Sequence, residues 1–266
     1  MSMSELRDLV IDAHGGIARW NKVKTVDGDM SIAGGLWARK GWPDALKDVH
    51  VTAAAGKQWI SYRPFIGEGM RSLCTPDHTI IETLDGKPVR DRRNPRAAFE
   101  GHIVETPWDD LHLAYFSGYA MWNYLNTPFI FALPGFQTEE IEPWDENGEK
   151  RRRLKVAFPD HIATHCPEQI FHVNDEGLIC RVDYSAPVAG GAPTAHYLDD
   201  HRDFFRNQGG HEAPGASPKS RRHRDSRSGF RSDRYRRNPL LMTGPPAAYG
   251  RPLPFFGRHA VGGTND

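Results

Sequence analysis

The chain has 266 residues, of which 38% are hydrophobic, and it carries 34 basic and 34 acidic side chains. This length suits one large domain or two smaller ones. The three cysteines, Cys74, Cys166 and Cys180, are odd in number and lack CxxC spacing, so they support neither a disulfide framework nor a zinc ribbon.

The charges are unevenly distributed along the chain. Before Phe204 there are 22 Lys and Arg against 30 Asp and Glu, whereas from Phe204 onward there are 12 against 4. The body is therefore mildly acidic and the end strongly basic. The first residues, MSMSELRDLVIDAHGG, carry acids where a signal peptide needs a basic segment followed by an apolar one. We therefore expect a cytoplasmic protein.

The first predicted elements are helical. Ser4 is suited to cap an amphipathic helix, and Gly15 is placed to end it in a left-handed conformation. A second helical turn is predicted over 17–23. The chain then changes to a strand pattern, and the segment 26–38 predicts one long strand that bends at its glycines.

Alternating apolar residues and turn dipeptides predict a β-meander in the first half of the chain. Its strands are expected at 49–53, 58–63, 70–74, 79–83 and 87–92. Further strands are predicted after a central apolar segment, at 138–143, 151–158, 169–173, 178–184 and 195–204. One antiparallel sheet interrupted once by helices indicates an α+β class.

The central segment, from Thr106 to Gly135, is the most aromatic part of the chain. Thr106 is a suitable N-cap and Pro107 fits the first helical position. After Asp110 no charged residue occurs until Glu139, and a helix that is apolar all round is normally buried. We predict two helices packed on the sheet, at 107–125 and 128–133. Interruption by Gly, Asn and Pro disfavours a transmembrane helix.

The end of the chain, 206–266, is rich in Gly, Pro, Ser and Arg and poor in branched aliphatic residues. We predict one folded domain over 1–205, with the helical insert at 106–135, followed by a disordered tail. Clustered arginines could tether nucleic acid, but a solvated tail is the favoured interpretation. A shifted reading frame is a further alternative.

Four segments carry a resemblance to a known group of proteins. They are AHGGIARWNKVKTV, TPWDDLHLAYFSGYAMWNYL, NDEGLICRVDY and AHYLDDHRDF, and they resemble a family of uncharacterised bacterial proteins. That family's expected fold is similar to the open half-barrel of the LolA and LppX type lipoprotein carriers. The resemblance implies a strongly curved sheet with covering helices, which enclose an apolar cavity for acyl chains. It implies no catalytic residues.

The first functional hypothesis is therefore binding or carriage of a hydrophobic small molecule or lipid in an apolar cavity. The aromatic insert would supply its wall. The expected wall residues are Trp108, Leu111, Tyr115, Phe116, Tyr119, Trp122 and Phe129.

The alternative hypothesis is an enzyme that acts on a hydrophobic substrate. Asp109 precedes His112 by three residues and Tyr115 follows it by three, so the three side chains would meet on neighbouring helical turns. An aspartate that orients a histidine is an arrangement suited to acid-base catalysis. The competing structural interpretation is that the aspartate caps the helix while the histidine and tyrosine make core hydrogen bonds.

No metal or cofactor is expected. His161 and His165 would lie about 13 Å apart in a strand, which is too far to bind one ion. His196 and His201 would point to opposite faces of their strand. No GxSxG, P-loop, HExxH or GxGxxG motif occurs.

Overall fold

The computed structural model describes residues 5–146, 148–202, 241–243 and 253–261. One long helix, α4 (Asp110–Asn126), is accompanied by shorter helical elements. These are α1 (Glu5–Ala13), α2 (Ile17–Trp20), α3 (Gly35–Arg39), and the 3-10 turns η1 (Pro95–Phe99), η2 (Phe129–Ala132) and η3 (Pro187–Ala189).

Seven strands form an antiparallel sheet, which we call sheet A. In spatial order they are β12 (Leu241–Thr243), β1 (Thr25–Met30), β2 (Val49–Ala54), β3 (Ile60–Arg63), β4 (Met70–Cys74), β5 (His78–Thr83) and β6 (Pro88–Arg93). From β2 to β5, Val51, Tyr62, Ser72 and Ile81 lie opposite one another and are all buried. The predicted meander is therefore confirmed, and this row of residues marks its inner face.

Six strands form a second antiparallel sheet, sheet B. In spatial order they are β13 (Leu253–Val261), β11 (Pro193–Arg202), β10 (Ile179–Ser185), β9 (Glu168–Val173), β8 (Glu149–Ala157) and β7 (Gln137–Glu146). Leu154, Phe171, Val182 and His196 lie opposite one another across β8 to β11, and all are buried. Each sheet has two end strands, so neither closes into a barrel.

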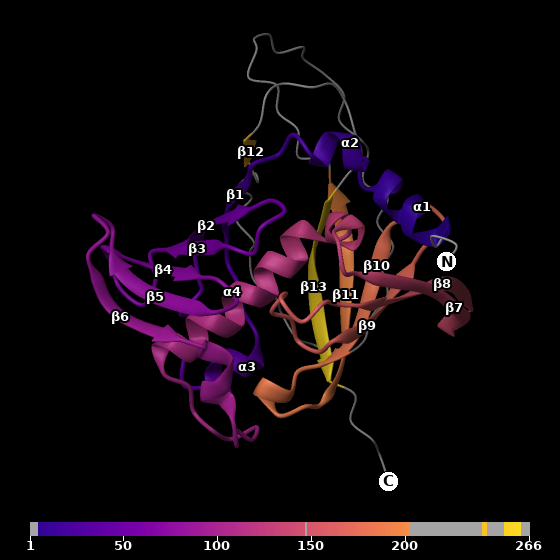
Figure 1. Ribbon diagram of the computed structural model, residues 1–266. Helices are drawn as coiled ribbons and strands as arrows, with labels where there is room; N and C mark the ends of the chain where they lie inside the picture. Colours follow the sequence, from indigo (N-terminus) through magenta and orange to yellow (C-terminus); the bar gives the residue numbers. More distant parts are fainter. Residues whose placement is uncertain (1–4, 147, 203–240, 244–252, 262–266) are drawn as a thin grey trace, which may run out of the picture.

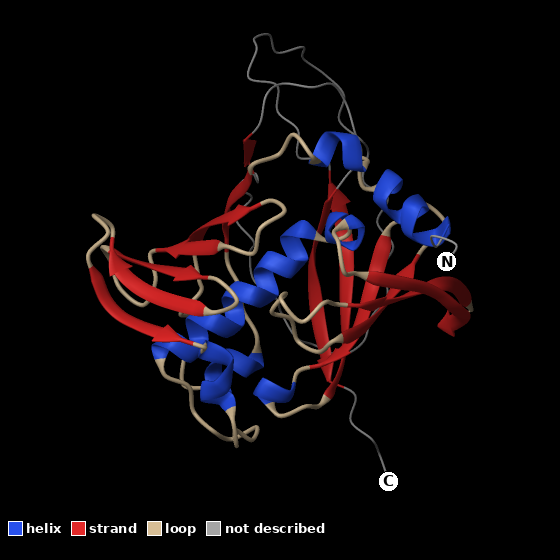
Figure 2. Ribbon diagram, in the orientation of Figure 1, coloured by secondary structure: helices blue, strands red, loops and turns tan. Residues whose placement is uncertain are grey.

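Helix α4 lies between the two sheets (Figures 1 and 2). Of its 17 residues all but Tyr124 are buried, as expected for a helix that is apolar all round. One face packs closely on sheet A. A Cβ added to Gly118 would lie 2.7 Å from the Cβ of Cys74 in β4, so the absence of a side chain allows this approach. Tyr62 in β3 donates a hydrogen bond of 2.8 Å to the Ser117 carbonyl.

The predicted fold class is confirmed, with some differences in detail. The fold is α+β and antiparallel, with an N-terminal helix and a central aromatic helix, but the strands form two sheets instead of one. The long strand predicted over 26–38 is wrong, because β1 ends at Met30 and α3 begins at Gly35. Residues 31–34 between them form neither strand nor helix, and Gly34, with φ 160° and ψ 155°, is the N-cap of α3.

The tail was predicted to be disordered over 206–266. Two segments of it are strands: β12 pairs with β1, and β13 pairs with β11. The rest of the tail, including the arginine-rich segment, lies outside the described residues, as do the first four residues with the expected cap Ser4. For those residues the predictions stay predictions.

Candidate functional site

Helix α4 begins three residues later than predicted, because its N-cap is Asp109 and not Thr106. The Asp109 carboxylate accepts a hydrogen bond of 2.8 Å from the His112 amide, which satisfies one of the free donors of the first turn. Arg92, from the edge strand β6, contacts the same carboxylate at 2.6 Å. Burial alone would raise the pKa of Asp109, but Arg92 and the His112 amide hold this pKa below its usual value.

His112 is held at both ring nitrogens. Its Nε2 lies 3.0 Å from the Ala98 carbonyl, and its Nδ1 lies 3.2 Å from the Asp109 amide and 2.7 Å from the Asp109 carboxylate. Its ring also packs edge-on against Phe99, with centroids 4.7 Å apart. A general base needs a nitrogen directed toward the substrate proton. This geometry therefore matches the structural interpretation of the Asp109, His112 and Tyr115 group and gives no support to acid-base catalysis.

The seven aromatic and aliphatic residues expected to form a cavity wall all lie in the core. Their exposed fractions range from 0% to 6%. They pack against one another and against neighbouring rings; Trp108 and Phe116, for example, have centroids 4.8 Å apart, and Phe129 stacks on Trp20 at 4.2 Å. The seven residues are therefore part of the packed core. That they form the wall of a cavity and contact a ligand stays a prediction.

The side of α4 that faces sheet B carries a cluster of aromatic and polar side chains, which we call the tyrosine–histidine cluster. It consists of Phe116, Tyr119, Tyr124, His165, Tyr184 and His196. The Tyr119 hydroxyl lies 3.2 Å from His165 Nδ1, and the Tyr124 hydroxyl lies 2.9 Å from His165 Nε2. Tyr124 and Tyr184 are joined by a hydroxyl–hydroxyl hydrogen bond of 3.1 Å.

The imidazole of His165 is the centre of this cluster. A neutral imidazole has one donor and one acceptor nitrogen, so one phenol accepts from it and the other donates to it. The ring also stacks on Tyr184, with centroids 4.3 Å apart and planes inclined by 7°. Burial raises the pKa of Tyr119 and Tyr124 well above the usual value, and raises that of Tyr184 to about 12. At neutral pH the cluster therefore presents uncharged phenols.

The loop that carries His165, residues 158–167, is fixed by side chains from the loop between β2 and β3, from η1 and from α4. Gln58 accepts from the Ala163 amide and donates to the Ala163 carbonyl, both at 2.7 Å. Asn123 donates to the same carbonyl at 2.9 Å, and Arg96 donates to the Thr164 carbonyl at 2.8 Å. Hydrogen bonds that satisfy buried backbone groups in this way rigidify a site.

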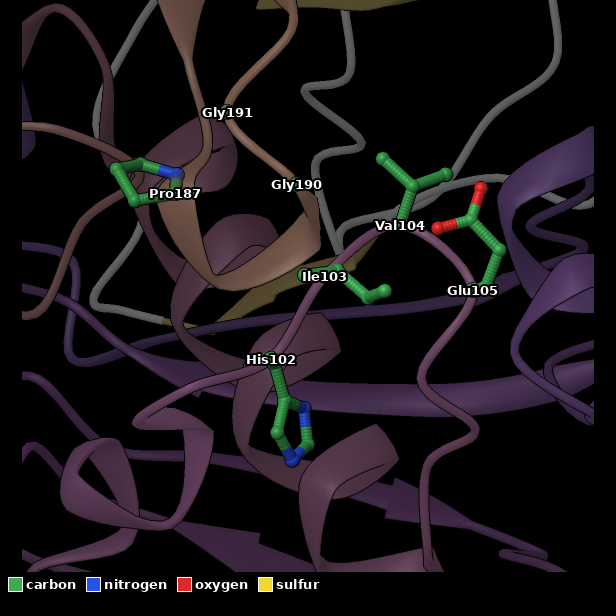
Figure 3. A pocket seen from close by; sticks show the side chains of 7 residues that line it. All are labelled: His102, Ile103, Val104, Glu105, Pro187, Gly190 and Gly191. Carbon is green, nitrogen blue, oxygen red and sulfur yellow. The ribbon is translucent and has the colours of Figure 1, made fainter.

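A hollow of about 500 Å³ opens where loops from the two halves of the fold meet (Figure 3). The loop between η1 and α4 contributes His102, Ile103, Val104 and Glu105, and the loop between β10 and β11 contributes Pro187, Gly190 and Gly191. Its volume lies within the range of about 300–1,000 Å³ that is usual for small-molecule sites.

Lys40 fixes the first of these loops. The side chain is fully buried, and its Nζ donates to the carbonyls of Ile103, Val104 and Thr106 at 3.0, 2.7 and 3.0 Å. All three ammonium hydrogens are thereby used. Burial lowers the pKa of Lys40. The loop wall of the hollow is therefore held in one conformation.

His165, Tyr184, His196 and His102 were not predicted to belong to one site, and His165 and His196 were considered only as metal ligands. The shared inner face of Tyr184 and His196 on the paired strands β10 and β11 could have brought these two together. No local pattern points to His165 or His102. Within the part of the chain that the structure describes, no three or more His, Cys, Asp or Glu side chains are grouped to hold a metal ion.

Comparison with solved structures finds partial likenesses. A DUF1329 family protein from Desulfovibrio piger is 11% identical, with a TM-score of 0.38 over 74% of this chain and 78% of that chain. A LolA superfamily protein from Nitrosomonas europaea is 10% identical, with a TM-score of 0.39 over 76% and 80%. A putative outer membrane lipoprotein-sorting protein domain from Vibrio parahaemolyticus is 8% identical, with a TM-score of 0.37 over 69% and 71%.

The second and third of these structures carry names of the lipoprotein-carrier type to which the sequence resemblance points. Likenesses at this level of identity and TM-score give no information about what this chain binds. No protein-family model and no curated protein matches the chain. Among the described residues, no helix combines the length and the hydrophobicity needed to cross a membrane.

Proposed function

We propose that this protein binds a hydrophobic small molecule or lipid between its two open sheets, beside α4. The observation that carries the proposal is the tyrosine–histidine cluster on the side of α4 that faces sheet B. Small-molecule sites are typically lined by aromatic and apolar side chains with a few convergent polar groups. The cluster has this composition, and its phenols are uncharged at neutral pH.

The arrangement of the sheets supports the same proposal. Because neither sheet closes, α4 packs between two open sheets and not inside a continuous hydrogen-bonded wall. We propose that side chains beside α4 move to admit an apolar ligand, which would break no strand pairing. Burial of its surface would contribute about 25 cal/mol per Å².

Titration with a fluorescent fatty acid tests the proposal. We expect the wild-type protein to bind the probe, and we expect Tyr184→Ala to weaken binding about fivefold, because the variant loses an aromatic contact worth about 1 kcal/mol. Tyr197→Ala is the matched control, since Tyr197 lies on the neighbouring strand and points to the opposite face, toward Glu146. If the wild-type protein binds neither this probe nor an uncharged alkyl alcohol such as octanol, the proposal is refuted.

A further inference from the structure

The hollow between the loop 102–105 and the loop 187–191 has the features of a binding site of its own. Its two walls are in tight contact: a Cβ added at Gly190 would lie 2.1 Å from the Val104 side chain, and the Gly190 backbone has φ 109°. Only glycine fits both the space and this conformation. Together with the three hydrogen bonds from Lys40, this contact makes the hollow preformed.

We propose that the hollow binds the hydroxyl end of an amphiphilic molecule, with His102 as its hydrogen-bond partner and Ile103 beside its apolar part. This inference rests on the proposed function and names the class of ligand. The molecule would be a fatty alcohol or a similar compound with one uncharged polar end.

The polar contact is assigned to His102 because its Nδ1 is buried and has no hydrogen-bond partner. A buried polar atom that lacks a partner is unfavourable, and a ligand that supplies one gains affinity. No hydrogen bond at Nδ1 opposes a turn of the ring toward the hollow. A hydroxyl group both donates and accepts, so it satisfies His102 in either neutral tautomer.

The charges around the hollow favour an uncharged ligand over a carboxylate. Glu105 lines the hollow and is exposed, so it repels an anion. The buried cation Lys40, which holds the loop 102–105, donates all three of its hydrogens to backbone carbonyls. Burial, and then the nearby His112 and Lys40, lower the pKa of His102, which keeps its ring uncharged at neutral pH.

The apolar contacts lead from the surface toward the core. Ile103 is 61% exposed, and with Val104 and Pro187 it gives the hollow an apolar lining. Behind His102 lie Phe99, at a centroid distance of 5.4 Å, and His112, at 4.9 Å. Phe99 in turn contacts Trp108 and Tyr115. An alkyl chain in the hollow would therefore lie at the outer end of the aromatic core beside α4.

Calorimetric titration with octanol and with octanoate tests this inference. We expect octanol to bind the wild-type protein and octanoate to bind at least tenfold more weakly. His102→Phe should weaken octanol binding about fivefold, and Ile103→Asp should do the same or more. The matched controls are His78→Phe, at a half-buried histidine in β5, and Ile66→Asp, at an isoleucine 38% exposed in the loop after β3. Neither control should change the affinity.

The outcomes separate the two proposals. If octanol binds equally well to the wild-type protein and to His102→Phe, the hollow is not the site, although hydrophobic binding stands. If octanoate binds as tightly as octanol, the ligand class is wrong. If neither octanol nor the fluorescent fatty acid binds, the proposed function itself fails. If His102→Phe does not fold, NMR of the wild-type protein replaces the variant. Octanol must then shift the ring resonances of His102, and unchanged resonances would overturn the assignment of the polar contact to His102.

Discussion

Substitution of Gly118 tests how closely α4 packs on sheet A. A Cβ at this position would lie 2.7 Å from Cys74 Cβ, 2.8 Å from Cys74 Sγ and 3.3 Å from Ile60 Cγ2. Carbon atoms attract best at about 3.5–4.0 Å, and neither Cβ can rotate away because both are bonded to the backbone. Gly118→Ala must therefore push α4 away from β4.

Two effects of opposite sign determine how far Gly118→Ala changes the free energy of unfolding. Replacing glycine by alanine inside a helix stabilises it by about 1 kcal/mol, whereas overpacking a tight core costs about 1–3 kcal/mol. Since the clash involves two atoms with fixed positions, we expect the cost at the upper end and a net loss of about 1–2 kcal/mol in the free energy of unfolding. For a domain of this size the melting temperature would fall by about 2–8 °C.

Urea unfolding followed by tryptophan fluorescence measures this loss. Gly35→Ala in α3 is the control, because a Cβ there would meet nothing within 4 Å, and it should leave stability unchanged or raise it. Cys74→Gly removes both clashing atoms, so a double-mutant cycle should show that it recovers part of the loss caused by Gly118→Ala. An increase in stability in Gly118→Ala, or no coupling in the cycle, would refute the proposed packing.

Three further predictions concern buried polar groups. Lys40→Met leaves three carbonyls without a donor and should lower the free energy of unfolding by about 1–3 kcal/mol; an unchanged urea midpoint would contradict this. Burial lowers the pKa of His14 to about 4 from its usual 6.5, so the unfolded chain binds the proton more readily, and up to ~3 kcal/mol of stability should be lost as the pH falls from about 6.5 to about 4. Across this pH range the melting temperature of His14→Leu should fall less steeply than that of the wild-type protein. An equal fall would contradict the assignment of this pH dependence to His14. Tyr124→Phe removes the hydroxyl shared by His165 and Tyr184 and should cost about 1–2 kcal/mol by the same urea assay, whereas Tyr197→Phe, at a partly exposed hydroxyl, should cost less.

Local patterns in the sequence determine much of the fold. The uncharged run after Asp110 predicts α4 and its burial, and turn signals such as Asp85-Gly86 predict the strands of the meander within one or two residues of β2 to β6. Apolar periodicity and turn chemistry act between neighbours in sequence. These features could therefore be predicted from the residues alone.

Features that depend on contacts distant in sequence could not be predicted. The alternation of apolar and polar residues along a strand does not determine which strands pair. The division of the strands into two sheets was therefore not predicted. Thr106 was predicted as the N-cap of α4, but its hydroxyl accepts a hydrogen bond from the Ile103 amide. Asp109 takes the cap position instead, as in the competing structural interpretation. His165 lies 46 residues after Tyr119, and no local spacing reveals that the two meet.

The same limit applies to the candidate site. The aromatic residues of α4 were identified as a group because they follow one another on a helix. The hollow was missed because its walls, His102 to Glu105 and Pro187 to Gly191, are joined only through the contact of Val104 with Gly190. Neither loop carries a motif.

Binding of an apolar ligand is tested by native mass spectrometry of the protein as purified, followed by organic extraction of what it carries. We expect an added mass that is released by organic solvent and identified as an apolar or amphiphilic molecule. We also expect protein that is stripped by the solvent and refolded to take up a supplied lipid again. If the protein carries no such mass, and takes up neither the fluorescent fatty acid nor octanol after refolding, it is not a carrier of apolar ligands.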